Sequence, residues 1–299
     1  MTSETKIHTL EDGRELAYCE YGDPNGDPVF HAHGVPSSRL EGMLLDSAAR
    51  AYGFRLISTD RPGIGKSTYL PNRVFLDYPK DIVSLADSIG IERFGVMGGS
   101  GGGAHTAVCA YAIPERLNFN VTICPFVNFA EFPSPETELS NAEAFTWKLT
   151  QISPGLVFMM CSLMGITVRT LGNRYEKWAA TAANQIPGMD GEVARSNPEK
   201  MKLMGPATVE AFAQGGKGVA ADTMIQYSDW GFRLADTKGK ILLFHGTGDS
   251  LIPYEFGQYI AEQMPNCELH ALEGYGHFIL IGKPELIFET ARKELDQPT

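Results

Sequence analysis

The sequence has little cysteine, and its cysteines are not paired. Five cysteines, an odd number, are spread through 299 residues, and no two of them form a CxxC motif. A disulfide framework and a zinc site built from paired cysteines are therefore excluded as organising features. We expect buried free thiols, and we predict neither a metal nor an organic cofactor.

Basic residues are also scarce. The 25 Lys and Arg against 36 Asp and Glu give a formal net charge of −11. A surface of this sign repels nucleic-acid phosphates and anionic membranes unless the charge is locally reversed. We therefore exclude nucleic acid as a partner and expect a small-molecule substrate, while the sequence leaves the oligomeric state open, a homodimer included.

The chain lacks an apolar run as long as a membrane span. Its uncharged stretch at 155–168 (GLVFMMCSLMGITV) has 14 residues, whereas roughly 20 are needed to cross a bilayer. We predict no membrane span and interpret the stretch as a buried helix, with contact to a membrane surface as the alternative. The N-terminal sequence has no basic segment followed by an apolar run, so we expect a cytoplasmic protein.

Short apolar runs rich in β-branched and aromatic residues predict buried parallel strands. They lie at 28–33, 54–60, 93–99, 118–127 and 240–246. Helical patterns separate the runs, and this alternation predicts an α/β fold whose mostly parallel central sheet is covered by helices on both faces. Turn signals near residues 12–13 and 22–26 predict an antiparallel hairpin at one edge.

Local signals also predict where individual helices begin. Ser38 and Glu41 have the spacing of a capping box. Asp77 and Gly90 bracket a helix with apolar residues at helical spacing, and Pro284 suits the first turn of the last helix.

The alternation of strands and helices lapses between residues 129 and 228. This stretch is Met-rich and helical in pattern, and it is interrupted by several prolines. We predict an α/β core formed by residues 1–128 and 229–299, with residues 129–228 inserted as a helical lid before the penultimate strand. We predict that four apolar side chains of this stretch line a substrate pocket: Phe145, Trp147, Phe158 and Met160. Packing within the lid would explain these side chains equally well.

Ser100 is the candidate nucleophile. It stands in Gly98-Gly99-Ser100-Gly101-Gly102, a G-x-S-x-G motif between an apolar strand and a helix of small residues. A serine at so sharp a turn is held in a strained backbone that only small neighbours permit, and its hydroxyl is exposed beyond the end of the strand. The start of the helix adds amide donors and a positive field.

A nucleophilic serine needs a base and an acid that orients the base. Of the seven histidines, His277 alone stands in a glycine-bounded loop after the last predicted strand, at the sheet edge where ligands bind in α/β folds. Asp249 follows the strand at 240–246, which gives the chain order Ser, Asp, His. A carboxylate after the strand at 118–127, such as Glu131, is the alternative acid.

The oxyanion of a tetrahedral intermediate needs two hydrogen-bond donors. The amide of Gly101 follows the nucleophile directly, and the amide of Val35 lies in the turn after an early strand. Pro36 has no amide to donate, and we interpret His33 as a packing residue of this turn.

Five motifs together resemble the α/β-hydrolase superfamily, specifically its lidded serine hydrolases. They are HGVP at 33–36, DRPGIGKS at 60–67, GGSGG at 98–102, GTGD at 246–249 and GH at 276–277. The resemblance covers nearly the whole chain except the lid, and it implies relatives among carboxylesterases, lactonases, C–C bond hydrolases and perhydrolases. It excludes dehalogenases and epoxide hydrolases, which use an aspartate nucleophile.

The residues and the resemblance together predict a carboxylesterase-like serine hydrolase. It would cleave an ester or related acyl bond of a small, partly apolar substrate through an acyl-enzyme. Two alternatives stay open: a C–C bond hydrolase or lyase on the same fold, and a small-molecule sensor with slow turnover.

Overall fold

A computed structural model describes residues 4–297 except 173, 175–180, 182–184 and 187. Its described part contains an eight-stranded sheet with the order β1-β2-β4-β3-β5-β6-β7-β8, in which β2 is antiparallel to both of its neighbours, β1 and β4, and the other neighbouring strands are parallel. The α/β fold and the edge hairpin predicted from the sequence are confirmed. The strands are β1 Lys6–Thr9, β2 Glu15–Gly22, β3 Asp27–Ala32, β4 Phe54–Thr59, β5 Phe94–Gly99, β6 Leu117–Ile123, β7 Ile241–Gly246 and β8 Cys267–Leu272.

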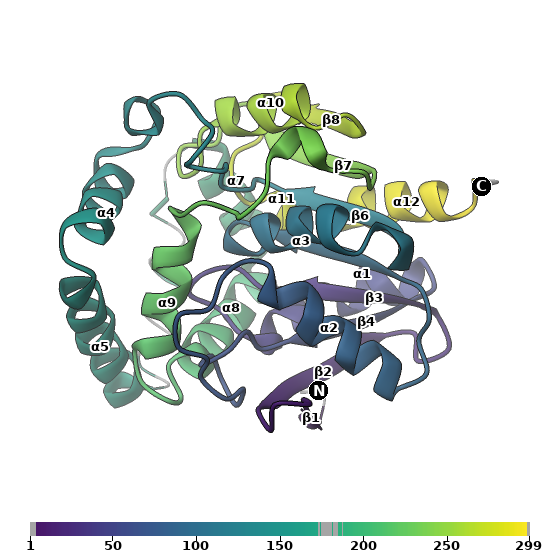
Figure 1. The fold of residues 1–299 in the computed structure, drawn as a ribbon, viewed down its shortest axis with the longest axis horizontal. Helices are drawn as coiled ribbons and strands as arrows, with labels where there is room; N and C mark the ends of the chain where they lie inside the picture. Colours follow the sequence, from purple (N-terminus) through teal and green to yellow (C-terminus); the bar gives the residue numbers. More distant parts are fainter. Residues whose placement is uncertain (1–3, 173, 175–180, 182–184, 187, 298–299) are drawn as a thin grey trace.

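Helices cover both faces of this sheet (Figure 1). Alternate residues of one strand face opposite sides, so Val29 of β3 packs with α1 and α12 while its neighbour Phe30 packs with α2 and α3. The helices of the core are η1 Arg39–Leu44, α1 Asp46–Ala51, α2 Asp77–Ser88, α3 Gly101–Ala112, η2 Pro114–Arg116, α10 Tyr254–Gln263, α11 Ile279–Gly282 and α12 Pro284–Leu295.

The described residues between β6 and β7 form helices and loops only. They lie along one end of the sheet, with α4 and α5 outermost (Figure 1). The helices are η3 Pro135–Thr137, α4 Asn141–Ile152, α5 Pro154–Leu171, α7 Gly188–Ser196, α8 Pro198–Ala211, α9 Lys217–Gln226 and η4 Leu234–Asp236. We keep the name lid for residues 129–228.

Several predicted element ends differ from the structure. The strand predicted at 118–127 ends at Ile123, because Cys124 turns the chain with a φ of 43°. Asp77 is the first residue of α2 rather than its cap. Ser38 caps η1 as predicted, but Glu41 does not complete a capping box, since its carboxylate accepts hydrogen bonds from Gly34 and His31 instead.

The interpretation of residues 155–168 as a buried helix is wrong. The stretch is helical and belongs to α5, but within α5 only Val157, Cys161, Gly165 and Val168 are buried. These residues recur at helical spacing and pack against Phe212 and neighbouring lid residues. Phe158 also packs against this cluster, and the other large apolar side chains of α5 are exposed.

Candidate active site

Ser100 occupies a strained turn between β5 and α3. Its φ of 56° and ψ of −128° lie outside the regions that residues with a side chain ordinarily adopt. The neighbouring glycines are required by close approach, because a Cβ on Gly102 would lie 2.0 Å from the carbonyl oxygen of Ala32. The predicted strand-turn-helix context of the G-x-S-x-G motif is therefore present.

His277 and Asp249 meet at the carboxyl edge of the sheet. The Nδ1 atom of His277 lies 2.8 Å from Oδ2 of Asp249. The other oxygen of Asp249 accepts hydrogen bonds from the amides of Leu251 and Ile252, both at 2.9 Å. These amides fix the carboxylate after β7, so that it can hold the imidazole in one orientation.

Asp249 and His277 each stabilise the charged form of the other. Burial raises the pKa of Asp249, but the interaction with His277 outweighs burial and leaves the pKa below its usual range. Burial likewise lowers the pKa of His277, and the attraction of Asp249 outweighs it and raises the pKa above 6.5. Asp249 is therefore ionised at neutral pH and stabilises the imidazolium.

The alternative acid, Glu131, is occupied elsewhere. Its carboxylate accepts hydrogen bonds from the amide of Leu234 and the side chain of Asn128. The structure thus brings Asp249, and not Glu131, to His277.

Val35 and Gly101 lie against each other beside Ser100. A Cβ on Gly101 would approach the Val35 side chain to 2.6 Å, so this side chain packs directly against Gly101. The amide of Gly34 already donates to both carboxylate oxygens of Glu41, at 3.1 Å each. The Val35 amide has no acceptor within the described part of the chain and remains available to a ligand.

The turn that carries Val35 is held by a buried arginine. The Arg61 guanidinium donates to the carbonyl oxygens of His33 and Gly34, and it pairs with Asp222 of α9 at 2.9 Å. Burial and the nearby Arg61 lower the pKa of His33 to about 3. His33 is therefore neutral and linked by hydrogen bonds to Gly34 and the Arg61 amide, as its interpretation as a packing residue requires.

Sequence reasoning missed Asp190, a buried residue of α7 in the lid. Its two carboxylate oxygens accept hydrogen bonds from the amides of His277 at 2.9 Å and Phe278 at 2.8 Å. It also crowds Gly276, where a Cβ would lie 2.3 Å from the carboxylate. No local sequence motif around Asp190 predicts this contact, because its partners lie 87 and 88 residues away in the chain.

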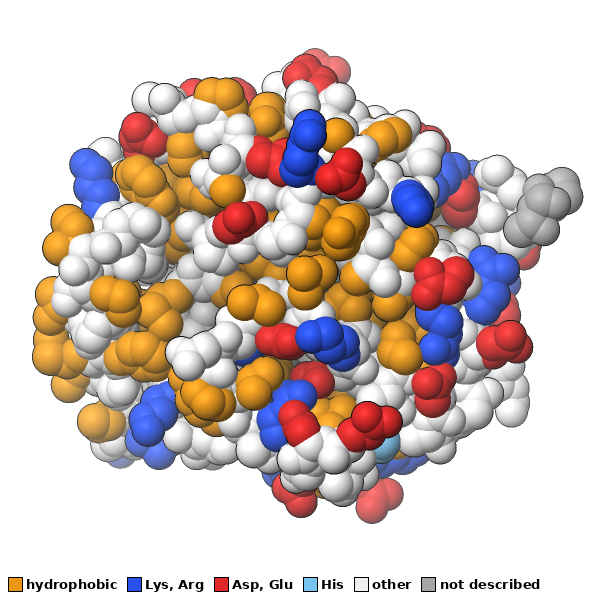
Figure 2. Space-filling view, in the orientation of Figure 1, with side chains coloured by type: hydrophobic (Ala, Val, Ile, Leu, Met, Phe, Trp, Pro, Cys, Tyr) orange, Lys and Arg blue, Asp and Glu red, His pale blue; other side chains and the backbone are white. Residues whose placement is uncertain are grey.

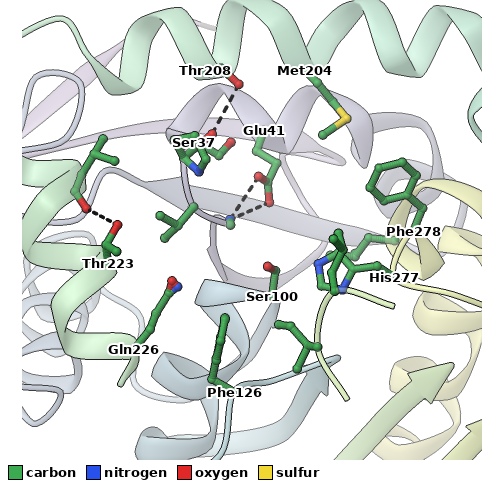
Figure 3. Close-up of a pocket in the computed structure, with 18 of the residues that line it drawn as sticks. Ser37, Glu41, Ser100, Phe126, Met204, Thr208, Thr223, Gln226, His277 and Phe278 are labelled. Atoms are coloured by element: carbon green, nitrogen blue, oxygen red, sulfur yellow. Dashed lines mark hydrogen bonds between the residues drawn. The ribbon is translucent and has the colours of Figure 1, made fainter. Parts of the chain in front are cut away.

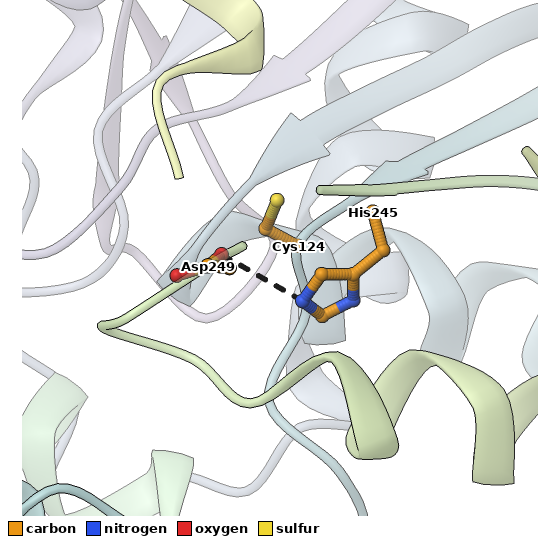
Figure 4. Close-up of side chains that lie close together, drawn as sticks. All are labelled: Cys124, His245 and Asp249. Carbon is orange, nitrogen blue, oxygen red and sulfur yellow. Dashed lines mark ion pairs between the residues drawn. The ribbon is translucent and has the colours of Figure 1, made fainter. Parts of the chain in front are cut away.

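Three potential metal ligands cluster around the same acid (Figure 4). Ligand atoms of Cys124, His245 and Asp249 lie within 4.8 Å of one another. Asp249 is already engaged by His277, and His245 Nε2 lies 3.1 Å from the carbonyl oxygen of Ile252. Burial and the Asp249 charge raise the pKa of the Cys124 thiol well above its usual range, so the sulfur is a protonated neighbour of Asp249 and a poor metal ligand.

Ser100 and His277 both face a cavity of about 740 Å³ (Figure 3). The cavity lies between the sheet edge and the lid, and most of its lining is apolar. Of the four lid residues predicted to line it, Met160 does so. The structure places the other three elsewhere: Phe145 is 62% exposed, Trp147 packs near Phe129, and Phe158 packs beneath α5 against the hydrophobic cluster that includes Phe212.

Two curated relatives match almost the full length of the chain. A bifunctional esterase/perhydrolase of Acinetobacter calcoaceticus is 25% identical over 294 residues, covering 96% of each chain. A 2-hydroxy-6-oxononadienedioate/2-hydroxy-6-oxononatrienedioate hydrolase of Burkholderia vietnamiensis is 26% identical, covering 91% of this chain and 88% of the relative.

The fold has matches among solved structures. The enol-lactonase of Burkholderia xenovorans LB400 superposes with a TM-score of 0.68 at 16% identity, covering 98% of this chain and all of the other. The family model described as alpha/beta hydrolase fold matches residues 27–284. This match spans the strands from β3 to β8, the serine turn and the histidine loop, and the chain therefore belongs to the α/β-hydrolase fold family.

Proposed function

We propose that the protein is a serine esterase in which Ser100 is the nucleophile, His277 the general base and Asp249 its acid. The observation that carries the proposal is the strained Ser100 turn facing the same cavity as the Asp249–His277 pair. Among the described residues no direct hydrogen bond joins Ser100 to His277. Such bonds commonly shorten only when substrate binds.

In the proposed reaction, Ser100 Oγ attacks the ester carbonyl carbon while His277 Nε2 takes the hydroxyl proton. The amides of Val35 and Gly101 would donate to the oxyanion of the tetrahedral intermediate. Collapse of the intermediate breaks the ester bond, and His277 returns the proton to the leaving alcohol. Water, activated by His277, then releases the acid from the acyl-enzyme.

The charges around the cavity favour a neutral substrate. The described lining includes the carboxylates of Glu41 and Glu143 but no lysine or arginine. The interaction with His31 holds the pKa of Glu41 at about 2 although burial alone would raise it, so Glu41 remains charged. An anionic acyl group would meet like charge without a compensating cation, and we therefore propose a neutral, partly apolar ester.

Hydrolysis of a C–C bond is the second candidate, favoured by the Burkholderia vietnamiensis relative. That relative is named for a dioate, which carries two carboxylates. The lack of a basic side chain in the described lining argues against such a substrate here. A diketone-type compound with a neutral tail is the form of this chemistry that the cavity suits.

Burst kinetics on p-nitrophenyl esters of graded acyl length test the esterase proposal. We expect turnover with a burst of acyl-enzyme that disappears in Ser100→Ala. A p-nitrophenyl hemisuccinate should react at least about tenfold more slowly than the butyrate, and Glu143→Gln should narrow this difference. Equal turnover by Ser100→Ala would remove Ser100 as nucleophile, and a folded native protein without turnover would favour the C–C hydrolase or the sensor.

The pH dependence should report the His277 pKa. His277 accepts a proton only when neutral, so kcat/KM should fall as the pH drops through a pKa above 6.5, the direction in which Asp249 shifts it. The measurement is kcat/KM for the best ester between pH 5 and 9. An inflection below pH 6 would contradict the assignment of His277 as base in this electrostatic setting.

Asp190 should act as a positioning residue. Asp190→Ala removes the acceptor for the His277 and Phe278 amides, and we expect kcat/KM to fall roughly 10- to 100-fold through misplacement of the imidazole. Because the Asp190 charge also raises the His277 pKa, the inflection in the pH profile should move down. A lower melting temperature with an unchanged pH profile would assign Asp190 a purely structural role.

A further inference from the structure

The outer face of α5 is apolar and exposed. We define it by Leu156, Met159, Leu163 and Ile166, which are between 44% and 58% exposed. These residues recur at helical spacing, on the side opposite the buried stripe of Val157, Cys161 and Val168. Hydrophobic side chains gather at the left edge of the molecule, over α4 and α5 (Figure 2).

This face extends onto the end of the preceding helix. Ile152, the last residue of α4, is 81% exposed, and Phe145 of the same helix is 62% exposed. Soluble proteins rarely keep a contiguous apolar surface of this kind without a partner.

The helix lies on the lid rather than apart from it. By length and composition alone it could cross a membrane, with 18 residues and a mean hydropathy of 1.5. However, Val157, Cys161 and Val168 pack against lid residues such as Phe212 and Val219. With this stripe held by protein, only the outer face is available, which is the arrangement of a helix lying in an interface.

The charged side chains of residues 144–172 are basic, whereas the chain as a whole is acidic. Residues 144–172 contain the basic side chains of Lys148 and Arg169 and no acidic side chain, in a chain whose net charge is −11. Both basic residues are exposed. An apolar helix face flanked by cations is complementary to a surface of acyl chains with anionic headgroups.

Between the outer face and the buried stripe, α5 borders the cavity. Met160 and Met164 are about 40% exposed and line the cavity that holds Ser100 and His277. A molecule leaving an apolar phase at this face would therefore meet side chains that continue into the cavity.

We propose that the outer face of α5 docks the protein on an anionic lipid surface. A second copy of the chain suits the face less well, because it would bring two molecules of net charge −11 together and set Lys148 and Arg169 of one against those of the other. The proposal does not require that Ser100 be catalytic, since binding is separate from turnover.

Co-sedimentation with lipid vesicles tests the proposal. The probes are vesicles of phosphatidylcholine mixed with phosphatidylglycerol and vesicles of phosphatidylcholine alone, used with the full chain carrying Ser100→Ala to prevent lipid hydrolysis. We expect stronger binding to the mixed vesicles, weakened by added salt. Leu163→Asp and Met159→Asp should each lower the partition coefficient at least about tenfold.

Matched variants separate the apolar and charged contributions. Ile7→Asp changes a side chain of similar exposure (47%) on β1, outside the face, and should bind like the parent. Lys148→Gln with Arg169→Gln should lower binding to mixed vesicles by roughly tenfold or more and change binding to phosphatidylcholine little.

Three results would overturn the proposal. They are no binding to mixed vesicles, binding that Leu163→Asp and Met159→Asp leave unchanged, and a dimer in sedimentation velocity that Leu163→Asp dissociates. The last would assign the outer face to a second copy of the chain.

Discussion

Asp249→Asn should lower kcat by about 10⁴-fold, as loss of the acid does in comparable triads. Asp249 Oδ2 lies 2.8 Å from His277 Nδ1, and its Oδ1 accepts two backbone amides. If the side-chain oxygen of the asparagine still accepts the hydrogen bonds of those two amides, its NH₂ group points at Nδ1 of His277. The imidazole must then carry its proton on Nε2, where it cannot accept the proton of Ser100.

The measurement is kcat for the best p-nitrophenyl ester, beside a thermal unfolding curve that shows the variant is folded. Glu131→Gln is the matched control, because Glu131 was the alternative acid and its carboxylate bonds to Leu234 and Asn128 instead. Glu131→Gln should retain most of the activity. If Asp249→Asn kept more than about a tenth of the native kcat, the assignment of Asp249 as the acid of the triad would be wrong.

Asp222→Ala should destabilise the protein by roughly 3–5 kcal/mol. Asp222 of α9 is 1% exposed and pairs with Arg61 and Arg73, whose side chains are 0% and 4% exposed. Removing the carboxylate leaves two guanidinium groups buried without a counter-charge. Their desolvation is then uncompensated, which costs far more than the pairs themselves contribute.

Equilibrium unfolding in guanidinium chloride measures this change. Glu199→Ala is the control, since the exposed Glu199–Lys202 pair should contribute nothing measurable. Burial raises the pKa of Asp222, but the two arginines outweigh it and lower the pKa below its ordinary 3.8. The contribution of Asp222 is therefore present at neutral pH and is lost only as the pH falls through that lowered pKa. A change in unfolding free energy below about 1 kcal/mol would contradict the expectation.

Asp222 also supports the candidate active site through its partner Arg61. Arg61 joins Asp222 of the lid to the carbonyl oxygens of His33 and Gly34, next to the Val35 amide. Together with Asp190, which holds the His277 loop, Asp222 makes the lid a support for both sides of the cavity. The lid therefore does more than cover the pocket.

Short motifs were sufficient to predict which side chains of the core meet at the cavity, namely Ser100, His277 and, behind His277, Asp249. Ser100 lies at a turn whose backbone demands small neighbours, so its glycines are visible in the sequence. Asp249 and His277 follow strands whose ends meet at one sheet edge, and strand order alone predicts that they approach. The fold could also be predicted from local patterns, because each strand and each helix has its own hydrophobic periodicity.

Contacts between lid and core could not be predicted in this way. Asp222 and Arg61 lie 161 residues apart, and nothing in the local spacing of either residue indicates the other.

Within the core, the capping-box spacing of Glu41 was misleading. Its carboxylate turns toward Gly34 and His31, because a buried amide and imidazole need an acceptor there.

The α/β fold, the strained serine turn and the order of serine, aspartate and histidine could be predicted from the amino-acid sequence, because local backbone geometry and periodicity specify them. Which lid residues reach the site, and which face of α5 is exposed, could be learned only from the folded chain. These depend on packing between distant segments: the α5 sequence is apolar on nearly all sides, and only the position of Phe212 and its neighbours determines which side is buried.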